Sequence, residues 1–210
     1  MSRHRIAIIG LGMAVAPHAK SLLDLGDRVE VAYAVAPSAA RRQGFSNRFS
    51  FPTTDSFKQI VDDRSITAVA VLTPPNTHLE MVEELARAGK HILLEKPLDV
   101  ATARAERLAG ACRQAGVTLG VVLQHRFKPA AERLAAVLRD EGLGRIVKCS
   151  TTIPVWRPQS YYDEPGRGTS ARDGGGVLLT QGIHTLDLML SLAGPVVEVC
   201  GYARTTPVHR

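Results

Sequence analysis

The sequence predicts an α/β protein of two domains, and three observations support this prediction. Short apolar segments alternate with helical patterns from Arg5 to Leu123, which is typical of a parallel sheet covered by helices on both faces. A turn containing two glycines follows the first apolar segment directly. After residue 123 the alternation stops, so we place a domain boundary there and expect domains at residues 1–123 and 124–210.

The first domain is expected to contain alternating strands and helices. Its strands are the apolar segments at residues 5–10, 29–36, 67–72, 91–95 and 117–123. Its helices are the periodic segments that end near residue 25 and that cover residues 39–49, 78–88 and 100–115. Gly89 and Gly116 stand where helix ends favour a left-handed residue, and Asp99 stands where a helix cap is expected.

The second domain is expected to belong to the α+β class. A helix over residues 129–139 leads into a strand at 146–156, which is followed by a polar loop at 157–173. A second helix at 177–192 ends before Gly194 and Pro195, and a further strand is expected at 196–205.

The composition of the chain excludes several classes of protein. Hydrophobic residues make up 45% of the 210 residues, yet no window holds the roughly 18 unbroken apolar residues that a membrane span needs. The net charge of +6 comes from scattered basic residues, so we expect no nucleic acid partner. This charge suits either small anionic ligands or a solvated surface. Cys112, Cys149 and Cys200 show no metal-ligand spacing and are expected to be buried thiols of a cytoplasmic protein.

The opening stretch RIAIIGLGMAVAPH allows two interpretations. Its basic start, apolar run and Ala-Val-Ala triplet imitate a secretory signal, but glycines and a proline interrupt that pattern. We interpret it as a buried strand that runs into the dinucleotide-binding turn of a Rossmann-type domain, where Gly10 makes the tight turn and Gly12 lets the backbone approach a pyrophosphate. Val15 replaces the third glycine of this fingerprint, so Ala14 and Ala16 are expected to make the close contact between helix and strand.

Four further motifs follow in order along the chain. They are LTPPNTHLE at residues 72–80, LLEKPL at 93–98, QHRF at 124–127 and GGGVLLTQGIHTLD at 174–187. Together with the glycine turn they resemble the Gfo/Idh/MocA family of nicotinamide-dependent oxidoreductases, over almost the whole chain. The resemblance implies a dinucleotide-binding domain at 1–123, a substrate and oligomerisation domain at 124–210, and reversible oxidation of a secondary alcohol of a sugar, inositol or related polyol.

The resemblance also implies catalytic roles for Lys96, His184 and Thr180. Lys96 would orient the substrate oxygen and stabilise its developing charge, and His184 would take the hydroxyl proton as general base. Outside such motifs, a lysine at a strand end is most often a surface charge, and a histidine on an apolar helix is most often a buried polar residue. The family often carries Asp at the position of Thr180, so the replacement puts the substrate class in doubt.

The expected cofactor is NADP, with NAD as the alternative. In NAD-preferring relatives an acidic residue at the end of the second strand binds the ribose hydroxyls and repels a 2′-phosphate. This position is Ala36 here, and Ser38 with Arg41 or Arg42 is available to bind the phosphate, unless both arginines are only solvated. The expected cofactor-binding residues are Gly10, Gly12, Met13, Ala14, Ala36, Ser38, Arg41, Arg42, Thr73, Pro74, Asn76, His78, Glu95 and Lys96.

Arginine forks and aromatic faces near the motifs suit a sugar-like polyol, an acid group or a sugar phosphate. The expected substrate-binding residues are Lys96, Arg126, Trp156, Arg157, Tyr161, Tyr162, Arg167 and His184. No metal ion is expected. For the loop at 157–173, a solvated connection is the alternative.

Two other functions fit the sequence. One is a nicotinamide-dependent glycosidase of the same family, and the other is a non-catalytic NAD(P)-binding sensor. The second domain offers only two candidate strands before residue 210, and such a small sheet is marginal on its own. We therefore expect either a fragment of a longer polypeptide or a partner subunit that covers exposed apolar surface, as in a homo-oligomer.

Overall fold

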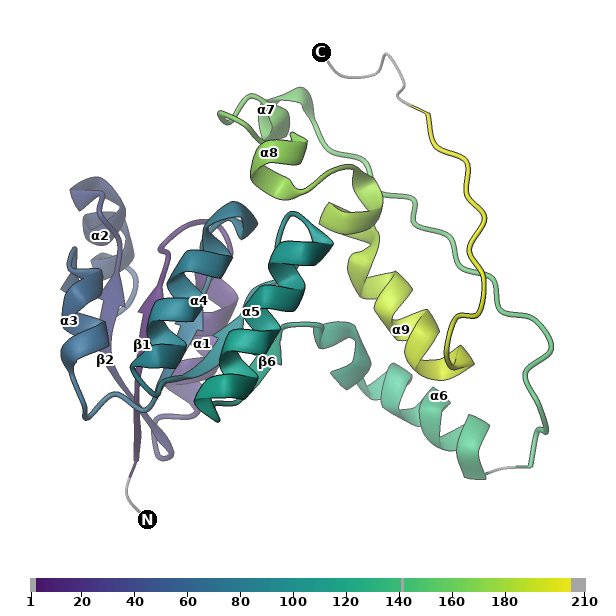
Figure 1. The fold of residues 1–210 in the computed structure, drawn as a ribbon, viewed down its shortest axis with the longest axis horizontal. Helices are drawn as coiled ribbons and strands as arrows, with labels where there is room; N and C mark the ends of the chain where they lie inside the picture. The colour runs from purple at the N-terminus through teal and green to yellow at the C-terminus, as the bar shows by residue number, and fades with distance from the viewer. Residues whose placement is uncertain (1–2, 141, 205–210) are drawn as a thin grey trace. The chain divides into compact units, whose positions relative to one another are not determined.

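The computed structural model describes residues 3–140 and 142–204. The chain divides into two compact units, Met1–Val122 and Leu123–Arg210. The first unit holds the parallel sheet and the second is largely helical (Figure 1).

The sheet of the first unit is parallel throughout, with strand order β3-β2-β1-β4-β5-β6. This is the order of a dinucleotide-binding Rossmann sheet, so the predicted fold class is confirmed. The strands are β1 His4–Ile9, β2 Val29–Val35, β3 Thr53–Thr54, β4 Ala68–Val71, β5 His91–Leu94 and β6 Leu119–Val121. The five strands predicted for the first domain all form, and β3 is an addition too short to show a pattern in the sequence.

Helices cover both faces of the sheet. They are α1 Val15–Asp24, α2 Ala39–Ser46, α3 Phe57–Asp62, α4 His78–Arg87 and α5 Thr102–Ala115. Alternate residues of a strand point to opposite faces, and β1 shows the result. Ala7 and Ile9 pack in one buried cluster with residues of α3, α4 and α5, whereas Ile8 packs in another with residues of α1 and α2. The core therefore lies in two layers, one on each face.

The helix ends agree with the sequence prediction at two glycines but not at Asp99. Gly89 and Gly116 have φ of +74° and +67°, as predicted for helix ends. Asp99 is not the cap of α5, which begins at Thr102 without a side-chain cap. Its carboxylate instead accepts a hydrogen bond of 3.2 Å from the backbone N–H of Leu79, in the first turn of α4. An anion is favourable there because the N-terminus of a helix carries partial positive charge.

The contact of α1 with the sheet also corrects a prediction. The buried residues of this helix are Val15 and Ala19, while Ala16 packs only at the margin of the cluster. Ala14, the cap position, is half-buried. Val15 is thus itself the close contact that a glycine would otherwise make.

A buried lysine stabilises the edge of the sheet at which the parallel strands begin. Lys90 is only 3% exposed, and its Nζ donates hydrogen bonds to the carbonyl oxygens of Asp63 (2.5 Å) and Ile66 (2.9 Å). Burial lowers the pKa of Lys90. The segment between α3 and β4 is therefore held by a side chain at the start of β5.

The second unit is built from helices and extended segments. Its helical elements are a 3₁₀ turn at Gln124–Phe127 (η2), α6 Pro129–Asp140, α7 Gln159–Tyr162, α8 Ser170–Asp173, a π-helical turn at Leu178–Gly182 and α9 Ile183–Ala193. The two predicted helices are confirmed. The predicted strands at 146–156 and 196–205 are wrong for the described residues, where neither segment joins a ladder and a tight turn joins Ile153 to Val155. A strand forms only where a neighbouring strand pairs with its backbone N–H and C=O groups. The side-chain pattern that predicted these strands says nothing about whether such a neighbour exists.

The prediction of buried thiols is also wrong in part. Cys112 is buried in α5, but Cys149 and Cys200 are exposed. Both exposed cysteines lie on the two extended segments, where no sheet covers them.

One helical stretch, Ser170–Ala193, reaches the length and mean hydropathy (1.2) of a membrane span by composition alone. Gly174–Gly176 interrupt it, and it carries the ionisable residues Arg172, Asp173, His184 and Asp187. Such residues are rare within membrane spans, so the absence of a membrane span stays our prediction.

Candidate active site

Three loops of the first unit follow adjacent strands at the carboxyl edge of the sheet. They are the turn at Gly10–Ala14 after β1, the segment Thr73–Thr77 after β4 and the segment Glu95–Asp99 after β5. Open α/β sheets bind ligands at this edge, where the strand order reverses. The structure therefore brings most of the predicted cofactor residues to one edge.

The two glycines of the first loop differ in whether the fold requires a residue without a side chain. Gly10 has φ of +99°, and a Cβ there would lie 2.8 Å from the backbone carbon of Leu72. Gly12 has no left-handed φ, and a Cβ there would meet no atom within 4 Å. Gly10 is thus required by the fold, whereas nothing in the described chain requires Gly12. The close approach of a pyrophosphate to Gly12 therefore stays our prediction.

The N-terminus of α1 is suited to receive an anion. Ala14 occupies the cap position without a side-chain hydrogen bond, and the first turn contains no acidic residue. The Val15 N–H donates to the carbonyl oxygen of Gly12 at 3.2 Å, and Pro17 has no N–H, so the positive end of the helix dipole is the main feature of this turn that favours an anion. Met13, next to this turn, is 69% exposed.

The loop after β5 is held by a pair that the sequence did not reveal. The Nε2 of His18, on α1, lies 2.9 Å from Oε1 of Glu95, and both side chains are 16% exposed. The other carboxylate oxygen of Glu95 accepts a hydrogen bond of 3.0 Å from the backbone N–H of Lys96. Lys96 is half-buried, and its peptide bond to Pro97 is cis. In the sequence, only the position of His18 on the helix after the glycine turn could have indicated a role at this site.

At the end of β2 the structure separates the two candidate arginines. Arg42 donates from Nη1 to the carbonyl oxygens of Ala36 (2.6 Å) and Pro37 (2.9 Å), so its guanidinium lies at the strand end. Arg41 is exposed, and its backbone N–H donates to Oγ of Ser38 at 3.3 Å. Ser38 is thus the cap of α2, as its position suggests. Ala36 is only 3% exposed, and its backbone N–H and carbonyl are bonded to Thr54 and Arg42.

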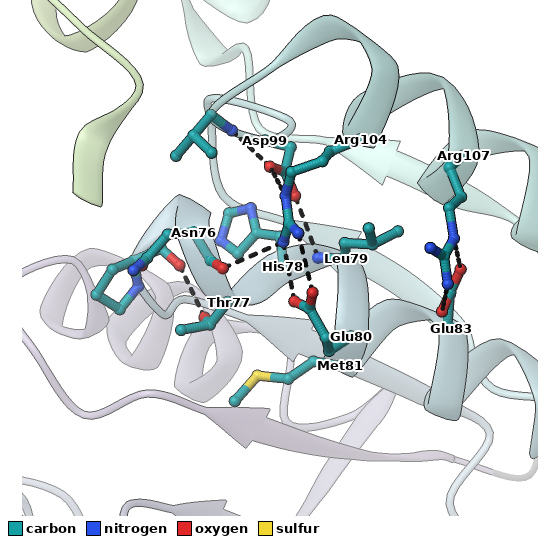
Figure 2. A network of polar contacts seen from close by, with 12 residues as sticks. Asn76, Thr77, His78, Leu79, Glu80, Met81, Glu83, Asp99, Arg104 and Arg107 are labelled. Atoms are coloured by element: carbon teal, nitrogen blue, oxygen red, sulfur yellow. Dashed lines mark hydrogen bonds and ion pairs between the residues drawn. The ribbon is translucent and has the colours of Figure 1, made fainter. Parts of the chain in front are cut away.

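The loop after β4 exposes Pro74 and Asn76 and half-buries Thr73. His78 behaves differently from the predicted cofactor contact. It is fully buried, with Nδ1 3.1 Å from the carbonyl oxygen of Leu98 and Nε2 2.9 Å from that of Thr73. Burial lowers the pKa of His78. Full burial and the two loop carbonyls fit support of the loop better than contact with a cofactor, and Figure 2 shows His78 among the polar residues of this region.

In the second unit, His184 lies at the start of α9, directly after the π-helical turn that contains Thr180. Its ring is 5.0 Å from that of His125, centroid to centroid. Arg126 donates from both Nε and Nη2 to the carboxylate of Asp187. The motif QHRF therefore packs against α9 within this unit. Thr180 donates from Oγ1 to the carbonyl oxygen of Gly176 at 3.1 Å.

Tyr161 is the centre of a second polar group in this unit. The guanidinium carbons of Arg167 and Arg157 lie 4.5 Å and 5.6 Å from its ring centroid. Gln181 links Arg157 to the Tyr161 hydroxyl by hydrogen bonds of 3.0 Å on each side. Tyr162 stacks edge-on against Tyr161, and Trp156 is 69% exposed. The loop at 157–173 is thus partly ordered by its own side chains.

Comparison with known proteins decides the family. The model described as "Oxidoreductase family, NAD-binding Rossmann fold" (GFO_IDH_MocA) matches residues 4–123. The chain belongs to the Gfo/Idh/MocA family. The model of the Gfo/Idh/MocA C-terminal domain matches residues 131–209.

Three Gfo/Idh/MocA relatives illustrate the similarity. The rhizopine catabolism protein MocA of Rhizobium meliloti is 28% identical over 92% of this chain and 58% of its own length. Myo-inositol 2-dehydrogenase of Thermotoga maritima is 26% identical over 92% of this chain and 56% of its own. The WlbA dehydrogenase of Bordetella pertussis, solved with NADH and UDP-GlcNAcA, is 29% identical with a TM-score of 0.84, over 92% and 56% of the two chains. The chain therefore spans about half the length of these Gfo/Idh/MocA proteins.

The two glycines of the first turn give a direct test of this Gfo/Idh/MocA site. We expect Gly10→Ala to lower the free energy of unfolding by about 3 kcal/mol, because the left-handed backbone and the contact with Leu72 both oppose a methyl group. Gly12→Ala should change it by less than about 1 kcal/mol but weaken NADPH binding at least about tenfold, since its methyl group would lie where a pyrophosphate approaches. Urea unfolding and fluorescence titration measure the two effects. Equal destabilisation by both variants would contradict the assignment.

Proposed function

We propose that this chain carries the cofactor site and part of the substrate site of an NAD(P)-dependent dehydrogenase acting on a secondary alcohol of a sugar, inositol or related polyol. The observation that carries the proposal is the uncapped N-terminus of α1 behind Gly12, at the edge of the sheet where Lys96 also lies. An anion site and a cationic side chain at one edge suit a dinucleotide and an oxygen that gains negative charge.

Each proposed residue has one task in the reaction. The bound nicotinamide supplies hydride transfer at its C4. Lys96 donates a hydrogen bond to the substrate oxygen and stabilises the charge that develops on it. His184 accepts the hydroxyl proton as general base. Glu95 fixes the backbone N–H of Lys96 and is itself fixed by His18, so the lysine starts from a defined backbone position.

A panel assay tests this function. The chain is mixed with NADP or NAD and a series of sugars, inositols and uronic acids, and the absorbance of the reduced cofactor is followed. Turnover of at least one secondary alcohol is expected. Release of the aglycone from an aryl glycoside without net reduction would support the glycosidase instead, and cofactor binding without any turnover would support the sensor.

We also propose a preference for NADP over NAD. The support lies at the end of β2, where no carboxylate follows the strand at Ala36 and the Arg42 guanidinium is held by main-chain carbonyls. An arginine at this place can pair with a 2′-phosphate through a charge-assisted bond, and the absence of an acidic residue removes a repulsion. Asp55, 3.5 Å from Nη2 of Arg42, competes for the same charge.

Replacement of Arg42 tests the preference. Arg42→Ala is expected to lower kcat/KM for NADP by about 10- to 100-fold, because one hydrogen-bonded charge pair contributes about that factor. The kcat/KM for NAD should stay within about threefold of the native value. Arg48→Ala is the matched control, because Arg48 lies just beyond the same helix and the one described contact of its side chain is with the Phe49 ring. A native preference for NAD, or equal loss with both cofactors, would refute the role of Arg42.

A further inference from the structure

Arg104, on α5, contacts three separate segments of the first unit. Its Nε donates to Oδ1 of Asp99 at 2.7 Å, and its Nη1 and Nη2 donate to the two carboxylate oxygens of Glu80 at 2.9 Å each. Nη2 also lies 3.2 Å from the carbonyl oxygen of Asn76. One guanidinium therefore reaches the loop after β4, the first turn of α4 and the loop after β5, as Figure 2 shows.

Asp99 completes the connection from the other side. Its side chain is fully buried, and its carboxylate accepts hydrogen bonds from the backbone N–H groups of Leu79 (3.2 Å) and Val100 (2.7 Å) as well as from Arg104. A buried carboxylate is costly unless its oxygens are satisfied. The pairing with Arg104 therefore fixes the end of the loop that begins at Glu95.

The same two loops are linked a second time beneath this pair. His78 has one ring nitrogen at the carbonyl oxygen of Thr73 and the other at that of Leu98. The loop after β4 is thus contacted at Thr73 and Asn76, and the loop after β5 at Leu98 and Asp99 near its end. A neutral imidazole donates from one nitrogen only, so Asp99 and Arg104 supply the stronger, charged part of the link.

We propose that Asp99 and Arg104 are positioning residues of the active site, which hold the segments Thr73–Thr77 and Glu95–Asp99 in fixed relation to each other. The inference rests on the proposed function, in which the first segment borders the cofactor and the second carries Lys96. Neither residue touches the reacting atoms. Each acts through the backbone of the loop that it holds.

A neighbouring ion pair provides a matched control. Arg107 on α5 also binds Glu83 on α4 in a bidentate pair, through Nε at 2.5 Å and Nη2 at 2.9 Å, where Arg104 binds Glu80 through its two terminal nitrogens. Both pairs join α4 to α5, three residues apart on each helix, but among the described contacts only Arg104 also reaches the two loops. Glu83 keeps 21% of its side chain exposed, whereas Asp99 keeps none. A merely structural role in joining the helices would make the two arginines equivalent.

The experiment compares Arg104→Met with Arg107→Met in the full 210-residue chain. Hydrogen exchange of the cofactor-free protein is followed in peptides covering residues 72–78 and 94–101. We expect Arg104→Met to speed amide hydrogen exchange about tenfold in both peptides, because one charged hydrogen-bonding group is lost. Arg107→Met should change the exchange rate by less than about twofold. Arg104→Lys should not restore protection, because one ammonium group cannot replace the fork.

A second measurement separates positioning from general destabilisation. Arg104→Met should weaken NADPH binding and lower kcat about tenfold each while KM for the alcohol changes less than about threefold, and Arg107→Met should leave these values near those of the native chain. Equal exchange and equal binding in the two methionine variants would overturn the proposal. Because exchange is measured without cofactor, it decides the loop contacts even where the panel assay finds no turnover and the proposed function fails.

Discussion

Lys96→Met is expected to abolish turnover, with a loss of roughly 100-fold to 10,000-fold in kcat. Methionine keeps most of the length and apolar character of the lysine side chain but removes the ammonium group that would stabilise the charge on the substrate oxygen. The backbone N–H of residue 96 can still donate to Glu95, so the loop should keep its conformation. Cofactor affinity should therefore stay within about threefold of the native value.

The measurement pairs the panel assay with fluorescence titration of NADPH. Lys58→Met is the control, because Lys58 is an exposed lysine of α3 that pairs with Asp62 on its own helix. It should leave both kcat and the dissociation constant unchanged. A loss of less than threefold in Lys96→Met would remove Lys96 from the mechanism.

His184→Ala is expected to lower kcat by a similar factor, roughly 100-fold to 10,000-fold, because a positioned general base is lost. The imidazole packs against that of His125, and burial together with Lys128 lowers the pKa of His125. A neutral His125 does not repel the positive charge that His184 gains when it accepts the hydroxyl proton. The ring pair is thus compatible with a base that becomes cationic.

His125→Ala separates chemistry from packing in this test. It removes the same ring contact but no proposed base, so kcat should fall less than about tenfold. Fluorescence titration of NADPH should give native affinity in both variants. If the two histidine variants lose activity equally, the loss comes from packing and His184 is not the base.

The sheet and most helices could be predicted because their signals are local. Apolar runs mark the strands of a parallel sheet, and glycines mark the helix ends. The short β3 and α3 lie below the length at which periodicity is visible. The segments at 146–156 and 196–205 have the composition of strands, but a ladder depends on a partner elsewhere in the chain, which local composition does not encode.

The candidate site likewise contains residues that the sequence could indicate and residues that it could not. The glycine turn was visible as a local motif, and Lys96 and His184 were selected by resemblance to a family. The contacts of His18 with Glu95 and of Arg104 with Glu80 join residues 77 and 24 positions apart. Such polar pairs depend on how the fold brings α1, α4 and α5 to the loops. No spacing rule in one sequence points to them.

Lys90 shows how the two edges of the sheet differ. At the carboxyl edge, the start of α1 has no side-chain cap, and we propose that a ligand binds there. At the amino edge, the buried ammonium of Lys90 is directed to main-chain carbonyls of the segment before β4. A change at Lys90 alters how firmly the strands are anchored, whereas a change at Gly12 alters what can bind. We therefore expect substitutions at the carboxyl edge to change ligand recognition, and substitutions at Lys90 to change the stability of the fold.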